Sequence, residues 1–159
     1  MIDRYFKTFT EHLQNEFAHI NTNGKQLTTQ SLLESLVGPM LRLNEIRPDG
    51  AATFMRLLGR AYTESQGHLK IFLSKKYEPL LTQFTALVHI ANPKLNDSDM
   101  FWRLHFMLGT LVFALAGHQA LSEIAEADLN ETVDTEGILR RLIPFLSAAM
   151  QPSITENQE

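Results

Sequence analysis

The stretch at residues 96–117, NDSDMFWRLHFMLGTLVFALAG, constrains the fold of this chain more than any other part. It begins with Asn96, Asp97 and Ser98, whose side chains can accept hydrogen bonds from the free amides at a helix start. The residues after them are apolar on almost every side, and a soluble helix of this kind is normally buried all round. One domain of this size covers one face, so a second chain is the simplest cover for the other. Gly109 and Gly117 would let another helix approach closely.

The length and composition predict a single globular domain over residues 1–152, followed by a polar tail at residues 153–159. The 159 residues are 44% hydrophobic and 20% charged, which suits a folded domain with a sizeable core. Arg103 and His105 interrupt the longest apolar run, so we expect no membrane-spanning segment and no membrane partner. There is no secretory pattern and no cysteine, which excludes disulfides and thiolate chemistry. We therefore expect a cytoplasmic protein.

The net charge of −4 is distributed unevenly. Residues 123–159 hold two basic and eight acidic side chains, whereas residues 21–122 are slightly basic. No cluster of lysine and arginine is dense enough to suggest a surface for nucleic acid. On charge alone, the chain as given is not expected to bind DNA.

Apolar residues recur at spacings of three and four, which predicts an all-α fold, a bundle of about six long helices. Gly38-Pro39 should kink or break the second helix, and Asp134 should cap the last one. Residues 118–133 form a polar, acidic connector with a short helix expected near residues 121–127. The long helices are expected at residues 2–20, 28–43, 49–65, 67–91, 97–117 and 134–150.

Motifs for catalysis and cofactor binding are missing from the sequence. It has no glycine-rich phosphate-binding loop, no nucleophile elbow and no His-Glu-x-x-His zinc pattern. No two of its six histidines lie three or four residues apart, so we expect no metal site and no cofactor. Polar residues stand singly on apolar helices, without the constellation that acid–base catalysis needs. We therefore expect a protein that is not an enzyme.

Trp102, Arg103 and His105 form the most distinctive polar and aromatic cluster. In one interpretation Arg103 or His105 points into an apolar pocket and fixes the polar head of a ligand. In the other, Arg103 makes a structural ion pair near the helix start and His105 is a satisfied core or interface histidine. Arg56 and Arg60, four residues apart, fit a solvated flank better than a ligand clamp.

Ten phenylalanines and six methionines either fill a core or line a cavity. Helices that contain prolines pack irregularly, and irregular packing between phenylalanine and methionine walls leaves apolar cavities. Methionine also adapts well to ligands of variable shape. We favour a ligand cavity over a fully packed interior.

Four stretches carry a resemblance to a known family: SLLESLVGPMLRL at 31–43, FMRLLGRAYTE at 54–64, FWRLHFMLGTLVFALAG at 101–117 and ILRRLIPFLSAAM at 138–150. In their order and spacing, the chain resembles the C-terminal ligand-binding and dimerisation domain of the TetR family of transcriptional repressors, in the subgroup typified by fatty-acid-responsive regulators. TetR regulators begin with a helix-turn-helix domain that binds DNA. The resemblance implies that this chain lacks that domain. An intact regulator would contact DNA only through it.

The resemblance also implies a homodimer that encloses an effector. The helices at 97–117 and 134–150 would form a four-helix bundle across a two-fold axis, burying on the order of 1,500 Å² or more. By position, the interface residues would be Trp102, Leu108, Gly109, Val112, Leu142, Phe145, Leu146 and Ala149. The ligand-binding residues would be Phe9, Leu13, Phe17, Leu36, Met40, Phe54, Leu58, Tyr62, Phe84, Val88, His105 and Phe106.

The function implied is the sensing of a hydrophobic or amphipathic small molecule, such as a fatty acid, an acyl thioester or an aromatic compound. The effector would control DNA binding by the N-terminal domain. The alternative is a ligand-free helical dimerisation module that pairs with a full-length regulator. A packed interior without a cavity would favour this alternative.

Overall fold

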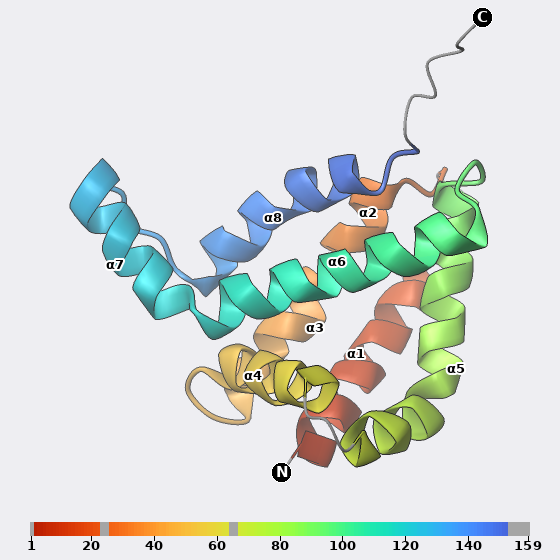
Figure 1. Ribbon diagram of the computed structural model, residues 1–159, viewed down its shortest axis with the longest axis horizontal. Coiled ribbons are helices and arrows are strands. Elements are labelled where there is room, and N and C mark those ends of the chain that lie inside the picture. The colour runs from red at the N-terminus through yellow and green to blue at the C-terminus, as the bar shows by residue number, and fades with distance from the viewer. Residues whose placement is uncertain (1, 23–25, 64–66, 153–159) are drawn as a thin grey trace, which may run out of the picture.

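The computed structural model describes residues 2–22, 26–63 and 67–152 of the chain. All regular structure in these residues is helical, as the sequence predicted. α6 and α8 run antiparallel along one side of the bundle, and α1, α4 and α5 lie on the other (Figure 1). The helices are α1 (Ile2–Thr22), α2 (Thr29–Glu34), α3 (Val37–Arg42), the 3₁₀ turn η1 (Leu43–Glu45), α4 (Gly50–Thr63), α5 (His68–Ala91), α6 (Asp97–Ala116), α7 (His118–Leu129) and α8 (Thr135–Ala149).

Side-chain caps fix the starts of α6 and α8. The Asn96 side chain accepts a hydrogen bond from the Asp99 amide at 2.8 Å, and Asp134 Oδ1 accepts one from the Gly137 amide at 2.8 Å. Each cap satisfies a donor that the helix cannot pair internally and contributes about 1 kcal/mol. The predicted cap at Asp134 is therefore confirmed.

The second predicted helix is broken into α2 and α3, which are separated by Ser35 and Leu36. Pro39 has no N–H to donate to the carbonyl of Ser35, so an uninterrupted helix would leave that carbonyl unpaired. The Pro39 side chain is fully buried inside α3. The break predicted from Gly38-Pro39 is confirmed.

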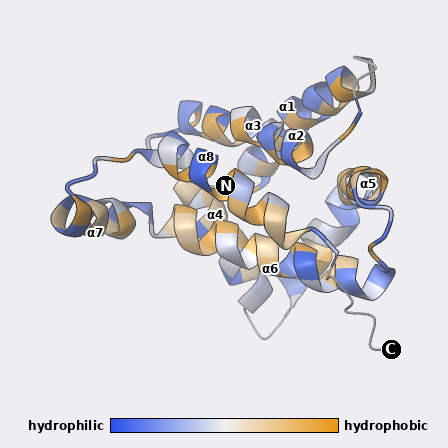
Figure 2. Ribbon diagram, turned by 90° about the horizontal axis from the view of Figure 1, so that it is seen from above, coloured by the Kyte–Doolittle hydropathy of each residue, from blue (hydrophilic) through white to orange (hydrophobic). Residues whose placement is uncertain are grey.

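The connector after α6 contains more helix than the sequence suggested. α7 covers all of His118–Leu129, and it ends where Asn130 takes a left-handed conformation with φ of 52°. Its alanine, glutamate and leucine residues are good helix formers, which the acidic composition obscured. α7 extends from the end of the bundle opposite α5 (Figures 1 and 2).

α4 packs closely on α6. A Cβ atom built on Gly59 would lie 2.8 Å from Val112 Cγ1, so only glycine allows this approach. Arg56 Nε also donates to the carbonyl of Ala116 at 3.4 Å. Hydrophobic and hydrophilic residues alternate around most helices, as expected for a bundle with a single interior (Figure 2).

Candidate ligand cavity and exposed apolar face

An inner cavity of about 180 Å³ lies at the centre of the bundle. α1, α4, α5 and α6 supply most of its wall, and almost every side chain in it is apolar. The ring of Phe54 is central: its centroid lies 4.8 Å from that of Phe6 and 5.5 Å from that of Phe9. The wall consists of Phe6, Phe9, Leu13, Leu36, Met40, Phe54, Met55, Leu58, Tyr62, Ser74, Tyr77, Leu80, Leu81, Phe84, Leu108 and Leu111.

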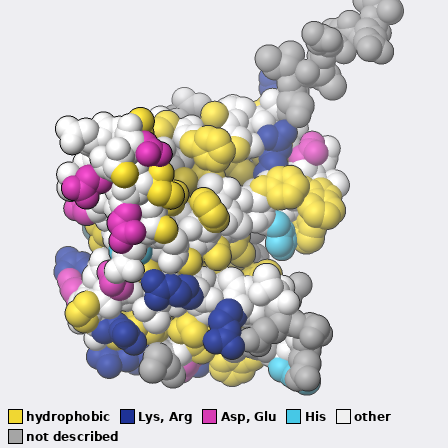
Figure 3. Space-filling model, turned by 60° about the vertical axis from the view of Figure 1, so that its left-hand side comes forward, with side chains coloured by type: hydrophobic (Ala, Val, Ile, Leu, Met, Phe, Trp, Pro, Cys, Tyr) yellow, Lys and Arg dark blue, Asp and Glu magenta, His cyan; other side chains and the backbone are white. Residues whose placement is uncertain are grey.

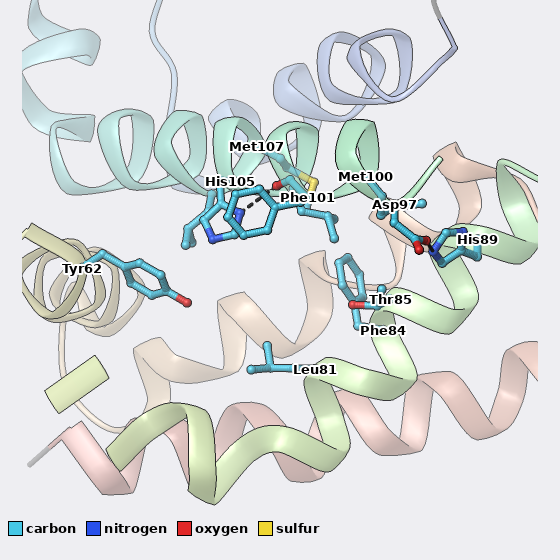
Figure 4. Close-up of a pocket in the computed structure, with 12 residues that line it drawn as sticks. Tyr62, Leu81, Phe84, Thr85, His89, Asp97, Met100, Phe101, His105 and Met107 are labelled. Carbon is cyan, nitrogen blue, oxygen red and sulfur yellow. Dashed lines mark hydrogen bonds and ion pairs between the residues drawn. The ribbon is translucent and has the colours of Figure 1, made fainter. Parts of the chain in front are cut away.

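An outer cavity of about 490 Å³ lies between α5, α6 and the end of α4 (Figure 4). Tyr62, Leu81, Phe84 and Leu108 line both cavities, so the two are adjacent parts of one site. The remaining wall of the outer cavity consists of Thr85, His89, Asp97, Met100, Phe101, Leu104, His105 and Met107.

Polar groups are concentrated in the outer cavity. His105 Nδ1 lies 2.7 Å from the carbonyl oxygen of Phe101, and because a carbonyl only accepts, Nδ1 carries the hydrogen. Nε2 is therefore the nitrogen that can meet a ligand, and the ring lies edge-on to Tyr62 with centroids 6.2 Å apart. At the opposite end His89 Nε2 lies 3.6 Å from Asp97 Oδ1 (Figure 4).

Tyr77 connects the inner cavity to the start of α1. Its ring stacks on Phe6 with centroids 4.5 Å apart, and its hydroxyl donates to Asp3 Oδ1 at 3.0 Å. Burial, and then this hydrogen bond, raise the pKa of Tyr77 to about 12. Hydrogen bonds from Lys76 and then Tyr77 lower the pKa of the Asp3 carboxyl. The phenol therefore stays protonated at ordinary pH and holds α1 against α5.

A second feature is the apolar surface on the outside of α6 and α8. Phe106 and Phe113 on α6 are 65% and 71% exposed, and Trp102 and Phe145 are also exposed. Hydrophobic side chains gather over the upper half of this face of the molecule (Figure 3). A groove of about 380 Å³ between α6 and α8 includes Trp102, Phe106 and Phe145 in its wall. We refer to Trp102, Phe106, Phe113 and Phe145 as the α6–α8 face.

Two further features of the described residues concern metal binding and membranes. Across residues 2–22, 26–63 and 67–152, no three His, Asp or Glu side chains are grouped as a metal site would require. Of the helices described, α6 has the length and composition to cross a membrane, but core helices of soluble proteins share both properties. Only 22% of that stretch is fully buried within the chain, and Trp102, Phe106 and Phe113 on it are exposed.

A comparison with protein families identifies the domain. The family model described as the tetracyclin repressor-like, C-terminal domain matches residues 34–149. The chain belongs to this family. The match runs from the end of α2 to the end of α8, so it includes most of the cavity wall and all of the α6–α8 face. TetR regulators are soluble, and their C-terminal domains typically bind ligands and form dimers rather than catalyse reactions. No curated protein sequence matches the chain.

The predicted ligand-binding residues of this TetR-like domain fall into three groups. Eight of them line the inner cavity, and His105 lines the outer one. Phe17 and Val88 are buried in the core, and Phe17 stacks on Phe84 from behind the cavity wall. Phe106 lies outside both cavities, on the α6–α8 face. The eight are Phe9, Leu13, Leu36, Met40, Phe54, Leu58, Tyr62 and Phe84.

The prediction missed other wall residues of the TetR-like domain. Phe6 lies on the same stripe of α1 as Phe9, and Tyr77 and Leu80 lie on the stripe of α5. Their helical spacing could have indicated them. Helical spacing could not indicate Phe101 and Leu108 on α6, because every side of that helix is apolar.

The predicted interface residues point in two directions, outward and inward. Trp102, Gly109, Phe145 and Ala149 are exposed on the outer side of α6 and α8, where a partner could reach them. The others face inward: Leu108 lines the cavities, Val112 packs on α4, and Leu142 and Leu146 pack in the core. Phe113, which was not predicted, lies on the outer side.

The arginines lie away from the cavity walls of the TetR-like domain. Arg103 Nη1 donates to the carbonyl of Ala149, which joins α6 to the end of α8. This contact fits the structural interpretation of Arg103. Arg56 bonds to the end of α6, and Arg60 is exposed.

Proposed function

We propose that the chain is the effector-binding and dimerisation domain of a TetR-family transcriptional regulator. A hydrophobic or amphipathic small molecule would occupy the two adjacent cavities, and the domain would act as a cytoplasmic homodimer. The observation that carries this proposal is that α6 lines the cavities with one side and presents uncovered aromatic residues on the other. Ligand site and partner site would then share one helix.

The walls favour an effector with an apolar body and a small polar group. The inner cavity is enclosed mainly by phenylalanine, leucine and methionine, whereas the imidazole of His105 and the carboxylate of Asp97 lie in the outer one. Among the described residues that line the two cavities, none is a lysine or an arginine. An apolar chain or ring would enter first, and its polar end would remain near His105.

The mechanism follows from which helices touch the ligand. α1 contributes Phe9 and Leu13 to the inner wall, and α4 contributes Phe54 and Leu58. In a regulator with a DNA-binding domain attached to α1, a ligand that fits one tilt of α1 better than another would change the spacing of the two DNA-binding heads. The ligand shifts this equilibrium only by its difference in affinity for the two states.

A substitution that fills the inner cavity tests whether the ligand binds there. Leu58→Trp places an indole in the inner cavity, whereas Ile90→Trp adds the same group at an exposed position of α5 outside both cavities. We expect Leu58→Trp to weaken binding of a neutral fluorescent probe, N-phenylnaphthylamine, by about tenfold or more, a loss of at least ~1.4 kcal/mol. Ile90→Trp should leave the affinity unchanged, and circular dichroism should show that both variants remain folded. Equal affinities for the two variants would refute the cavity as the binding site.

Native mass spectrometry of the gently purified chain tests the dimer and the ligand together. We expect a dimer that carries a small molecule, whose mass would identify the effector class. A monomer would contradict the dimerisation proposal. A dimer with no extra mass that also fails to bind the fluorescent probe would favour the ligand-free dimerisation module instead.

A further inference from the structure

α7 has no buried side chain, although it is a 12-residue helix. Ile124 is 56% exposed, and Leu129 is also exposed. The helix extends beyond the end of the bundle in two perpendicular views (Figures 1 and 2). An isolated helix of this length is marginal in water, because packing of an apolar side normally supplies most of its stability. Apart from Leu121, which packs against the core, α7 therefore lacks the packing that normally stabilises a helix of this length.

The start of α7 is held by Leu121, and its C-terminal end by local hydrogen bonds. Its end closes with hydrogen bonds from the Asn130 amide to the carbonyl of Glu126 and from the Glu131 amide to the carbonyl of Ala125. Ser122 Oγ donates to the carbonyl of Val133 at 3.0 Å, which ties the middle of α7 to the segment that follows it. α7 is thus a defined extension rather than a loose loop.

α7 adjoins the end of the α6–α8 face. Phe113 is the last aromatic residue of that face along α6, and it lies one turn before Gly117, where α7 begins. Acidic side chains lie beside hydrophobic ones on the face of the molecule drawn in Figure 3. None of the α7 residues lines either cavity, so a ligand there would not cover Ile124.

We propose that α7 is an arm that packs on a second copy of this chain, at the edge of the α6–α8 face. The inference rests on the proposed homodimer and adds a second contact to it. In a two-fold dimer both subunits use the same patch. A partner that packs on the α6–α8 face would therefore also reach α7, which adjoins that face. A second copy is the occupant that the continuity with Phe113 supports.

Cysteine labelling tests the arm, because the chain has no cysteine of its own. Ile124→Cys reports on the arm, and Ile90→Cys is the matched control, since Ile90 is 65% exposed on α5. The dimeric protein and a monomeric reference, the variant Phe106→Glu, are treated with a maleimide. We expect Ile124→Cys to react about tenfold more slowly in the dimer than in the monomer, which corresponds to a contact of ~1.4 kcal/mol. Ile90→Cys should react at the same rate in both.

The dimer dissociation constant gives a second readout that does not need the monomeric variant. We expect Ile124→Glu to raise this constant about tenfold in sedimentation velocity and Ile90→Glu to leave it unchanged. A dimer in which Ile124→Cys reacts freely and Ile124→Glu has no effect would overturn the arm while keeping the dimer. A wild-type chain that is monomeric at every concentration would overturn both proposals.

Discussion

Replacing Gly59 with alanine tests the contact that sets how α4 sits on α6. Gly59 lies inside α4, where alanine normally stabilises a helix by about 1 kcal/mol relative to glycine. The added Cβ would lie 2.8 Å from Val112 Cγ1, closer than two carbon atoms can approach. Val112 is β-branched and stiff, so relief requires movement of a helix, and such overpacking costs about 1–3 kcal/mol. We expect Gly59→Ala to lower the free energy of unfolding by up to ~2 kcal/mol.

A double-mutant cycle isolates this contact. In a Val112→Ala background the crowding methyl group is gone, so Gly59→Ala should raise the free energy of unfolding by about 1 kcal/mol. The coupling between the two sites is then about 1–3 kcal/mol. Urea unfolding of the four proteins, followed by circular dichroism at one protein concentration, measures it. If Gly59→Ala has the same effect in both backgrounds, the close approach of α4 to α6 is wrong.

Three further predictions concern single groups. The free energy of unfolding should fall as pH rises from about 10 to about 12, because the raised pKa of Tyr77 keeps its phenol protonated in the folded chain while an unfolded tyrosine ionises near 10. Tyr77→Phe should remove that part of the pH dependence in urea titrations. Asn92→Ala should lower the free energy of unfolding by about 1–3 kcal/mol, because the buried Asn92 amide donates to Thr29 Oγ1 at 2.7 Å; equal urea midpoints for mutant and wild type would contradict this. Gly109→Ala should stabilise the helix by about 1 kcal/mol, since nothing lies within 4 Å of the added carbon, yet it should weaken a dimer whose helices cross there. Thermal unfolding and sedimentation measure the two effects, and an unchanged dimer would place the crossing elsewhere.

Much of the fold was predictable because its signals are local. The caps at Asn96 and Asp134 and the break near Pro39 depend on residues within one helical turn. The extent of α7 was harder to predict, because an exposed acidic helix has no apolar stripe within the chain to mark its length.

The site was predictable only as far as apolar stripes allow. A stripe shows which residues face inward, but it does not separate a cavity wall from the layer behind it. Phe17 and Phe84 illustrate this, because their rings stack and only Phe84 reaches the cavity. His105 and Phe106 were expected to close the same cavity, yet neighbours on a helix point about 100° apart. One lines the outer cavity and the other lies on the α6–α8 face.

The rotation of α6 about its own axis decides which of its apolar residues serve the ligand and which serve a partner. Its composition requires cover on every side, but composition is the same for any rotation. Packing of Val112 against Gly59, together with the burial of Met107 and Leu115, fixes that rotation. A rotation by one residue, about 100°, would turn the outer aromatic stripe toward a neighbouring helix. The ligand-facing and outward-facing residues of α6 are therefore set together, and a substitution that disturbs its packing on α4 should affect probe binding and dimerisation at once.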